Sequence, residues 1–338
     1  ELDDADEFVG YLRPGSLKAG TLGGWPLHRR LHWVETPRWS MGWRGRWDRL
    51  DLYHGPNFKM HTTGRFGGIV TIHDLWLARH PEYSRKLFGQ AGSSRRAIAT
   101  ANRARKVVTV SEFSAREIES LYGIAREHIV VIHNGVSDDF APLRQAEVRA
   151  ELFHRWDIPA AGFILFVGGA DPRKNHAVFL QAVAKVRAQL GGRAVLLVGD
   201  PDHPQGSYRA TAQGLSLDKD VRCTGRLDRE ELRRLYSCTD LFVFPSRYEG
   251  FGMPVLEAMA CGAPTVTSST SSLPEVAGDA ALLVDPDDVE GLGRAMVTAL
   301  SDASLRDGLR QRGYERARLF TWRRAAASTS ALYRELCT

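Results

Sequence analysis

The chain has 338 residues, of which 43% are hydrophobic and 25% charged, and its net charge is +5. These values describe a globular protein with room for two domains, and they exclude a disordered chain. No run of 18 apolar residues occurs, which argues against a membrane-spanning helix, and the four cysteines lack the CxxC spacing of a zinc site and fit a reducing cytoplasm.

Basic residues gather in the first third of the chain. Residues 11–110 hold 18 Lys and Arg against 5 Asp and Glu, whereas residues 161–338 hold 22 against 21. A basic face attracts anionic partners. The alternative is that arginine-rich helix surfaces account for the excess.

Short apolar runs alternate with amphipathic stretches, which predicts an α/β protein with parallel sheets. Between the strands of the first half, the sequence predicts helices over 94–105 and 111–123, the second with Ser111 as its N-cap. The predicted strands of this half are 7–12, 51–55, 68–74, 106–111 and 128–135.

A polar connection over about residues 136–160 separates this half from a second run of strands. We therefore expect two doubly wound domains, whose ligands bind beyond the carboxyl ends of the strands. The predicted strands of the second half are 163–169, 194–200, 221–227, 241–246, 263–269 and 281–286.

The stretch RYEGFGMPVLEAMACGAPTV, residues 247–266, follows one of these strands. Pro254 suits a first helical position, and Gly250 and Gly252 would let a ligand approach the backbone. Since a helix N-terminus carries unpaired N–H groups and partial positive charge, the stretch predicts a phosphate site without a metal.

Two acids bracket this predicted phosphate site. Glu257 lies about one turn into the helix, where its carboxylate could accept hydrogen bonds from ribose hydroxyls. Glu249 lies at the strand end, where it could hold sugar hydroxyls or face developing positive charge. The alternative for Glu257 is that it merely complements the helix dipole.

The stretch FVGGADPRKNH places a second group of candidates after a strand. Gly168 and Gly169 end the strand, and Arg173 and Lys174 could neutralise a diphosphate, Arg through paired hydrogen bonds and Lys as a point charge. The alternative is a solvated basic turn.

A third strand end, in GIVTIHDLW, carries His73 and Asp74. Both are expected at a strand end that faces a cleft between the domains, where His73 could contact a reacting sugar. The alternative for His73 is a bond to a neighbouring carbonyl. The segments 133–136 and 111–113 also follow strands and are interpreted as loop-shaping.

Five of the eight tryptophans fall between Trp25 and Trp47. Tryptophan interleaved with arginine is typical of a membrane interface. The alternative is core or interdomain packing, because Trp39, Trp43 and Trp47 share one face of a helix. The arginines of this segment are Arg29, Arg30, Arg38, Arg44, Arg46 and Arg49.

Over residues 50–335 the chain resembles the retaining glycosyltransferases of family 4, and the PRKN form is most similar to bacterial mannosyltransferase-type members that build surface polysaccharides. The resemblance implies the GT-B fold, two doubly wound Rossmann-like domains facing across a cleft. The motifs that carry it are HDLW (73–76), SEFS (111–114), HNGV (133–136), DPRKNH (171–176), EGFGMPVLEAMACGAPTV (249–266) and SSLPEVAGDAALLVDP (271–286).

The resemblance also implies which part of the chain binds which substrate. Residues 1–150 would bind the acceptor, residues 151–320 would bind a nucleotide sugar, and the helix over 321–338 would return to the first domain. The chain opens at what resembles the second strand of such enzymes, so a first βα unit is expected to be missing.

By the same resemblance, Arg173 and Lys174 would grip the diphosphate and Glu257 the ribose. Glu249, with the backbone of Gly250, Phe251, Gly252 and Met253, would hold the donor sugar. Relatives carry an arginine where this chain has Gly169 or Ala170, so Arg173 would serve instead. The implied catalytic residues are Glu249, His73, Lys174 and Arg173, and His73, Asp74 and Asn57 would lie on the acceptor side.

The implied reaction is transfer, with retention, of a sugar from a nucleotide diphosphate to a glycan or lipid-linked acceptor. We expect GDP-mannose first and UDP-sugars next, with no cofactor and no metal, in the cytoplasm or peripherally at the inner face of the membrane. The Asp-Pro-Asp runs at 200–202 and 285–287 are interpreted as turns.

Three rival functions remain at this point. A nucleotide-sugar epimerase would share the architecture. An NAD-dependent dehydrogenase should show GxGxxG after a strand, which GGADPRK is not. A nucleic-acid binder is suggested only by the basic segment, which contains no recognised motif.

Overall fold

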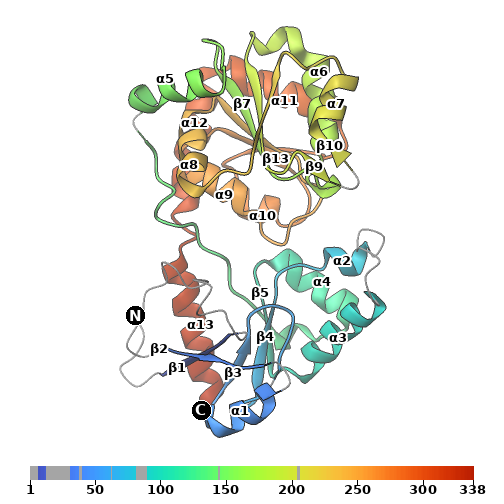
Figure 1. The fold of residues 1–338 in the computed structure, drawn as a ribbon, viewed down its shortest axis with the longest axis vertical. Helices are drawn as coiled ribbons and strands as arrows, with labels where there is room; N and C mark the ends of the chain where they lie inside the picture. The colour runs from blue at the N-terminus through green and yellow to red at the C-terminus, as the bar shows by residue number, and fades with distance from the viewer. Residues whose placement is uncertain are drawn as a thin grey trace. The chain divides into compact units, whose positions relative to one another are not determined.

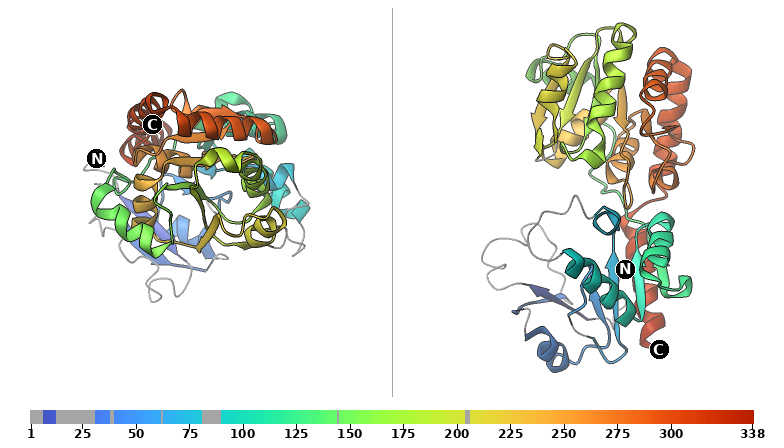
Figure 2. Two further views of the ribbon diagram at one scale, coloured as in Figure 1. Left: turned by 90° about the horizontal axis from the view of Figure 1, so that it is seen from above. Right: turned by 90° about the vertical axis from the view of Figure 1, so that its right-hand side faces the viewer.

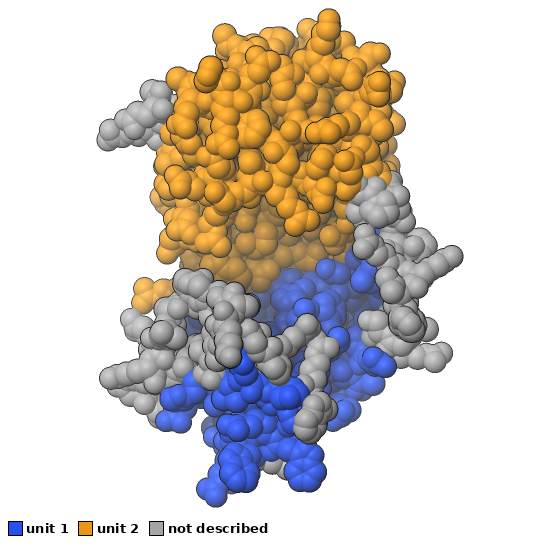
Figure 3. Space-filling view, in the orientation of Figure 1, with its two compact units in different colours: residues 1–110, 114–132, 326–338 blue, residues 111–113, 133–325 orange. Residues whose placement is uncertain are grey.

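A computed structural model describes residues 7–12, 31–37, 40–61, 63–80, 90–143, 145–203 and 206–338. The chain divides into two compact units, coloured separately in Figure 3. The first unit comprises residues 1–110, 114–132 and 326–338, and the second comprises 111–113 and 133–325. The domain limits at 150/151 and 320/321 stay predictions.

The second unit is built on a six-stranded parallel sheet with the order β11-β8-β7-β12-β13-β14. The three central strands are apolar and fully or almost fully buried, as expected of a sheet covered on both faces. The strands are β7 (Phe163–Val167), β8 (Ala194–Val198), β11 (Val221–Gly225), β12 (Leu241–Phe244), β13 (Thr265–Ser268) and β14 (Leu282–Val284).

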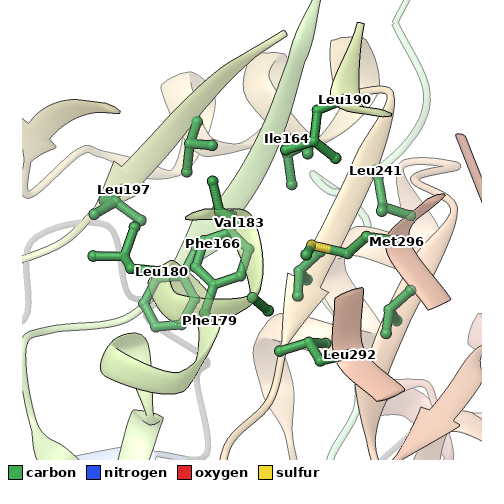
Figure 4. Packing of buried hydrophobic residues seen from close by; sticks show 14 of the residues in the cluster. Ile164, Phe166, Phe179, Leu180, Val183, Leu190, Leu197, Leu241, Leu292 and Met296 are labelled. Atoms are coloured by element: carbon green, nitrogen blue, oxygen red, sulfur yellow. The ribbon is translucent and has the colours of Figure 1, made fainter. Parts of the chain in front are cut away.

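Helices cover both faces of this sheet (Figures 1 and 2). On one face, Phe166 of β7 stacks on Phe179 and joins a cluster with Met296 (Figure 4). On the other face, Phe163 contacts Phe153, as expected when alternate residues of a strand point to opposite sides. The helices of this unit are α5 (Gln145–Arg155), α6 (His176–Val186), α7 (Tyr208–Gly214), α8 (Arg229–Cys238), α9 (Met253–Ala260), α10 (Leu273–Ala277), α11 (Val289–Ser301) and α12 (Ala303–Ala317).

The first unit contains a four-stranded parallel sheet in sequential order, β3 (Tyr53–Gly55), β4 (Gly68–Ile72), β5 (Lys106–Thr109) and β6 (Ile129–Val131). Val70, Ile72 and Val107 of this sheet form a core with Ala101 and Ile118 of two helices. The helices of this part are α1 (Met41–Trp47), α2 (Trp76–Arg79), α3 (Gln90–Arg103) and α4 (Glu112–Tyr122).

The last helix, α13 (Trp322–Cys337), contributes residues 326–338 to the first unit. The hydroxyl oxygen of Tyr333, on this helix, lies 2.6 Å from Nδ1 of His54, and the side chain of Leu336 is 3% exposed. These contacts tie the end of the chain to the strands of the first unit.

The predicted strands and helices are found with bounds shifted by a few residues, with two differences. The predicted strand 7–12 becomes β1 (Phe8–Leu12), which pairs with β2 (Leu31–Glu35) in a separate two-stranded sheet. The polar connection 136–160 contains a helix, α5, that the sequence analysis did not predict. That helix packs on α8, a tertiary contact with no strong local signal.

Candidate active site

The strand order of the second unit brings two predicted segments together. From β7 the sheet grows toward β8 and β11, and from β12 it grows toward β13 and β14. The reversal lies between β7 and β12, and ligands of open α/β sheets bind beyond the carboxyl ends of the strands at such a point. Lys174, after β7, and Glu249, after β12, meet there at 2.6 Å between Nζ and Oε1.

The two cations of the turn after β7, Arg173 and Lys174, lie beside different carboxylates. Asp171 caps the short helix Pro172–Lys174 by accepting a hydrogen bond from the Arg173 N–H at 2.9 Å. Nη2 of Arg173 lies 3.8 Å from an oxygen of that same Asp171, and the Arg173 side chain is 20% exposed. The Arg173 side chain thus lies near Asp171 of its own turn, and Lys174 reaches Glu249 of the other segment.

Lys174 and Glu249 form a pair with little solvent access, their side chains being 15% and 10% exposed. The ammonium group also lies 5.2 Å from the centre of the Phe244 ring, and Ser246 Oγ lies 2.7 Å from Oε1 of Glu249. An added Cβ at Gly168 would lie 3.3 Å from Lys174 Cγ. A glycine at 168 therefore leaves the room that the lysine stem occupies.

Hydrogen bonds fasten the loop after β12 to the turn after β7. The carbonyl of Arg173 accepts from the Arg247 N–H at 2.9 Å and lies 3.0 Å from Ser246 Oγ. The single proton of the Ser246 hydroxyl can go to this carbonyl, to that of Tyr248 or to Glu249. Both strand ends are thus held in one arrangement.

The serines after β13 support the same loop. Ser271 has a φ of +57°, uncommon for a residue other than glycine, and its Oγ accepts from the Glu249 N–H at 3.1 Å. Ser272 is fully buried, and its hydroxyl lies 2.9 Å and 2.8 Å from the carbonyls of Glu249 and Phe251. The sequence analysis missed both serines, although they lie in the SSLPEVAG stretch.

Gly252 precedes α9 with a φ of +110°, a conformation that favours glycine. The sequence analysis placed Pro254 at the first position of this helix. The helix begins at Met253, so Pro254 is its second residue. The Phe251 ring is 4% exposed and contacts Phe320, so the predicted donor contact at this position would have to come from its backbone. The carbonyl of Gly250 accepts a hydrogen bond from a hydroxyl, that of Ser111.

Glu257 projects from α9 next to a buried phenol. The hydroxyl of Tyr236, a fully buried residue of α8, lies 3.4 Å from its Oε2. Burial raises the pKa of Glu257 to about 7, while the Tyr236 hydrogen bond and the positive charge of Arg229 act in the lowering direction. A change of pH around neutrality therefore changes the ionisation of this carboxyl group.

The acceptor-side candidates lie in the first unit. His73 Nε2 lies 2.9 Å from the carbonyl of Pro56, so the structural alternative for this histidine is present. Asp74 accepts from the Trp76 N–H at 3.0 Å in a turn, and Asn57 is exposed. The reactive roles of His73, Asp74 and Asn57 stay predictions.

Two family models match the chain: glycosyltransferase family 4 over residues 9–140 and glycosyl transferases group 1 over residues 149–316. The O-antigen chain mannosyltransferase B of Escherichia coli is 34% identical over 317 residues, which cover 91% of this chain and 79% of that protein. The chain belongs to the group 1 glycosyltransferases.

Other relatives match less of their own length. The serotype-specific mannosyltransferase WbdA of Escherichia coli is 34% identical over 68% of this chain, which is 28% of WbdA. Among solved structures, that of Anabaena HepE in complex with UDP and glucose has a TM-score of 0.76 at 19% identity, covering 97% of this chain and 91% of that one. This likeness supports the GT-B fold, in which the glycosyltransferase has two Rossmann-like domains.

The comparisons leave the epimerase and dehydrogenase alternatives without support. In the described part of this glycosyltransferase, no helix is long and apolar enough to cross a bilayer. The catalytic and donor-binding assignments rest on the geometry given above and stay predictions.

Glu275 of this glycosyltransferase was also missed by the sequence analysis. Its carboxylate accepts from the N–H groups of Glu112 and Phe113 at 2.9 Å and 3.2 Å and lies 2.7 Å from Nε2 of His133. Burial alone would raise the pKa of Glu275, but these hydrogen bonds hold it below its usual range. The loop-shaping segments 111–113 and 133–136 therefore share one carboxylate partner.

Proposed function

We propose that this glycosyltransferase moves a mannosyl group, with retention at the anomeric carbon, from a nucleotide diphosphate to a glycan or lipid-linked acceptor in surface polysaccharide synthesis. The observation that carries the donor site is the Lys174–Glu249 pair at the point where the strand order reverses. The names of the mannosyltransferase relatives support mannose, and GDP-mannose precedes UDP-sugars as the proposed donor.

The donor half would work by electrostatic stabilisation. When the bond from the anomeric carbon to the diphosphate breaks, negative charge grows on the departing phosphate. Lys174 and Arg173 follow β7 in the chain, the N–H groups at the start of α9 follow β12, and the Lys174–Glu249 hydrogen bond joins the two segments before any ligand binds. Fixed positive groups are worth most where charge develops away from water.

Glu249 would face the sugar rather than the phosphate. Its carboxylate is nearly buried, and Lys174 and Ser246 hold one of its oxygens. In the proposed reaction the acceptor oxygen bonds to the anomeric carbon on the face that the phosphate leaves. The acceptor hydroxyl proton passes to a departing phosphate oxygen, so no enzyme nucleophile is assigned.

The test of the donor site is a calorimetric titration with GDP, UDP, ADP and NAD⁺, with and without Mg²⁺. We expect one nucleoside diphosphate to bind without the metal, and Lys174→Ala to weaken its binding about 10- to 100-fold, as for lost hydrogen bonds to a charged group. Lys185→Ala, an exposed lysine of α6, is the matched control. Unchanged affinity in Lys174→Ala would refute the phosphate assignment, and activity lost to EDTA and restored by Mn²⁺ would refute metal independence.

We further propose that α1 contacts an anionic membrane surface. Trp43 and Trp47 lie four residues apart on this helix and are 78% and 82% exposed, so the core alternative is wrong for both. Trp39 and Trp25 lie outside the described residues. Exposed tryptophans in a basic segment suit a lipid interface, where rings enter the headgroup region and cations meet anionic lipids.

The membrane proposal predicts that the protein sediments with vesicles containing phosphatidylglycerol and much less with vesicles of neutral lipid. The double variant Trp43→Ala/Trp47→Ala should lose most of this binding, because it removes the apolar side chains that enter the interface. Trp322→Ala, a half-exposed tryptophan elsewhere, should keep it. Equal binding by the double variant and the unmodified protein would contradict the assignment to α1.

A further inference from the structure

Asn175 follows Lys174 directly and occupies an unusual conformation. Its φ and ψ are 62° and 34°, in the left-handed region, and it is 1% exposed. It stands at the N-cap position of α6, yet its side chain makes no capping hydrogen bond. A left-handed residue other than glycine costs free energy, so a requirement for the asparagine side chain has to offset that cost.

The side-chain amide of Asn175 spans two other strand ends. Its Nδ2 donates to the carbonyl of Pro245, which follows β12, at 3.1 Å and to the carbonyl of Pro286, which follows β14, at 2.5 Å. Because both partners are carbonyl oxygens, only the nitrogen of the amide can face them, which determines the orientation of the amide. The turn after β7 is therefore bound to two neighbouring segments through one side chain.

The rest of the Asn175 amide gains nothing from this arrangement. Its Oδ1 is buried and has no hydrogen-bond partner among the described residues. A buried acceptor left unpaired costs stability and calls for an explanation. The amide is thus oriented for its two donor bonds.

The bonds of Asn175 complete a clamp around Lys174. On one side of the lysine, the Arg173 carbonyl accepts from the Arg247 N–H. On the other side, Asn175 holds the carbonyl of Pro245, at the start of the same loop. Both peptide neighbours of Lys174 are fixed to the loop that carries Glu249, so the ammonium group has a defined place without a ligand.

We propose that Asn175 is a positioning residue that sets Lys174 at the diphosphate of the donor. The inference rests on the proposed donor site. A cation already held in place loses less side-chain freedom on binding, so its hydrogen bonds contribute more to affinity. Asn175 itself need not touch the ligand.

The decisive variant is Asn175→Gly, because glycine adopts the left-handed conformation freely while both amide bonds are lost. We expect the dissociation constant of the nucleoside diphosphate to rise about tenfold, the loss of one well-placed charged hydrogen bond. The affinity for the matching nucleoside should change by less than about twofold, because the nucleoside has no phosphate for Lys174 to contact. A general loss of structure would instead lower the affinity for both ligands.

Two further variants distinguish a positioning role of Asn175 from a general effect on the folded structure. Ser216→Gly, which replaces another left-handed residue that is exposed and precedes β11, should leave both affinities unchanged. Asn175→Ser, with one hydroxyl proton, can make at most one of the two bonds and should also weaken the diphosphate selectively. This second variant keeps the test open if Asn175→Gly does not fold.

A double-mutant cycle distinguishes the positioning role of Asn175 from the proposed donor site on which it rests. In a Lys174→Ala background, Asn175→Gly should weaken the diphosphate by less than about twofold, because the cation that it positions is gone. A full tenfold effect in that background, or equal losses for nucleoside and diphosphate, would overturn the positioning role. Unchanged diphosphate binding in Lys174→Ala would instead overturn the phosphate assignment of the proposed function.

Discussion

At the residue scale, one carboxyl group of the candidate site has a pKa near neutral pH. Burial raises the pKa of Glu257 to about 7, and Tyr236 and Arg229 moderate this rise. The ionised carboxylate is the better acceptor for hydrogen bonds from two vicinal hydroxyls. Affinity for the ribose of a donor should therefore depend on the ionisation of this one group.

We predict that nucleoside binding strengthens as the pH rises from 6 to 8, by a few fold, as Glu257 ionises. Calorimetry in buffers of different ionisation enthalpy should show proton release near pH 6.5. Glu257→Gln should abolish the dependence, and Tyr236→Phe should shift it to higher pH, because the lost hydrogen bond had lowered the pKa. A pH dependence that persists in Glu257→Gln would contradict this role. The nucleoside is used because a diphosphate itself titrates in this range.

At the element scale, β7 and α6 provide the frame on which the turn 168–175 is mounted. Phe166 and Phe179 are fully buried and stack at 5.5 Å between ring centres (Figure 4). Protein interiors are close-packed, so a change of volume at one core residue affects the residues around it. Phe166 precedes the turn and Phe179 follows it, so this pair joins the two elements that the turn connects.

Phe166→Ala should lower the free energy of unfolding of the second unit by about 3–5 kcal/mol, the usual cost of deleting a buried aromatic ring. Denaturant unfolding followed by hydrogen exchange in β7 and α6 would measure it. Leu319→Ala, at a leucine that is 47% exposed, should change the same quantity by less than about 0.5 kcal/mol. A small loss at Phe166 would mean that the cluster relaxes around the missing ring.

At the scale of the whole molecule, each unit carries one half-buried titratable group, and the two groups change stability with pH in opposite directions. In the first unit, burial, with a further contribution from His73, lowers the pKa of His54 to about 4. Its ring nitrogens lie 2.6 Å from Tyr333 and 2.7 Å from Thr71, so the neutral ring is held as a bridge to the end of α13.

We predict that acid affects the two units differently. Between pH 6.5 and 4 the unfolded state binds the proton at position 54, so stability of the first unit falls as the pH falls. In the second unit Glu257 binds its proton in the folded state, so that contribution to stability rises as the pH falls from 7 to 4.5. Unfolding at pH 5 and 7.5, followed by hydrogen exchange, should show the first unit losing protection at pH 5. His54→Gln should remove that difference; its persistence would assign the acid sensitivity elsewhere.

Local patterns in the sequence determined the α/β class, most strands and helices, and the residues after the strands. Lys174, Glu249 and Glu257 could be singled out because glycine, proline and charge follow apolar runs at these places. Periodicity and helix end signals act over a few residues, so they are readable without a fold.

Tertiary structure decided which of these segments meet and what supports them. The neighbours β7 and β12 are far apart in the chain, and the partners of Asn175 are backbone carbonyls that carry no residue signal. The exposure of Trp43 and Trp47 could not be told from core packing, because a helical stripe of aromatic residues fits both. Strand pairing, burial and backbone acceptors depend on contacts between distant segments, and these exist only after folding.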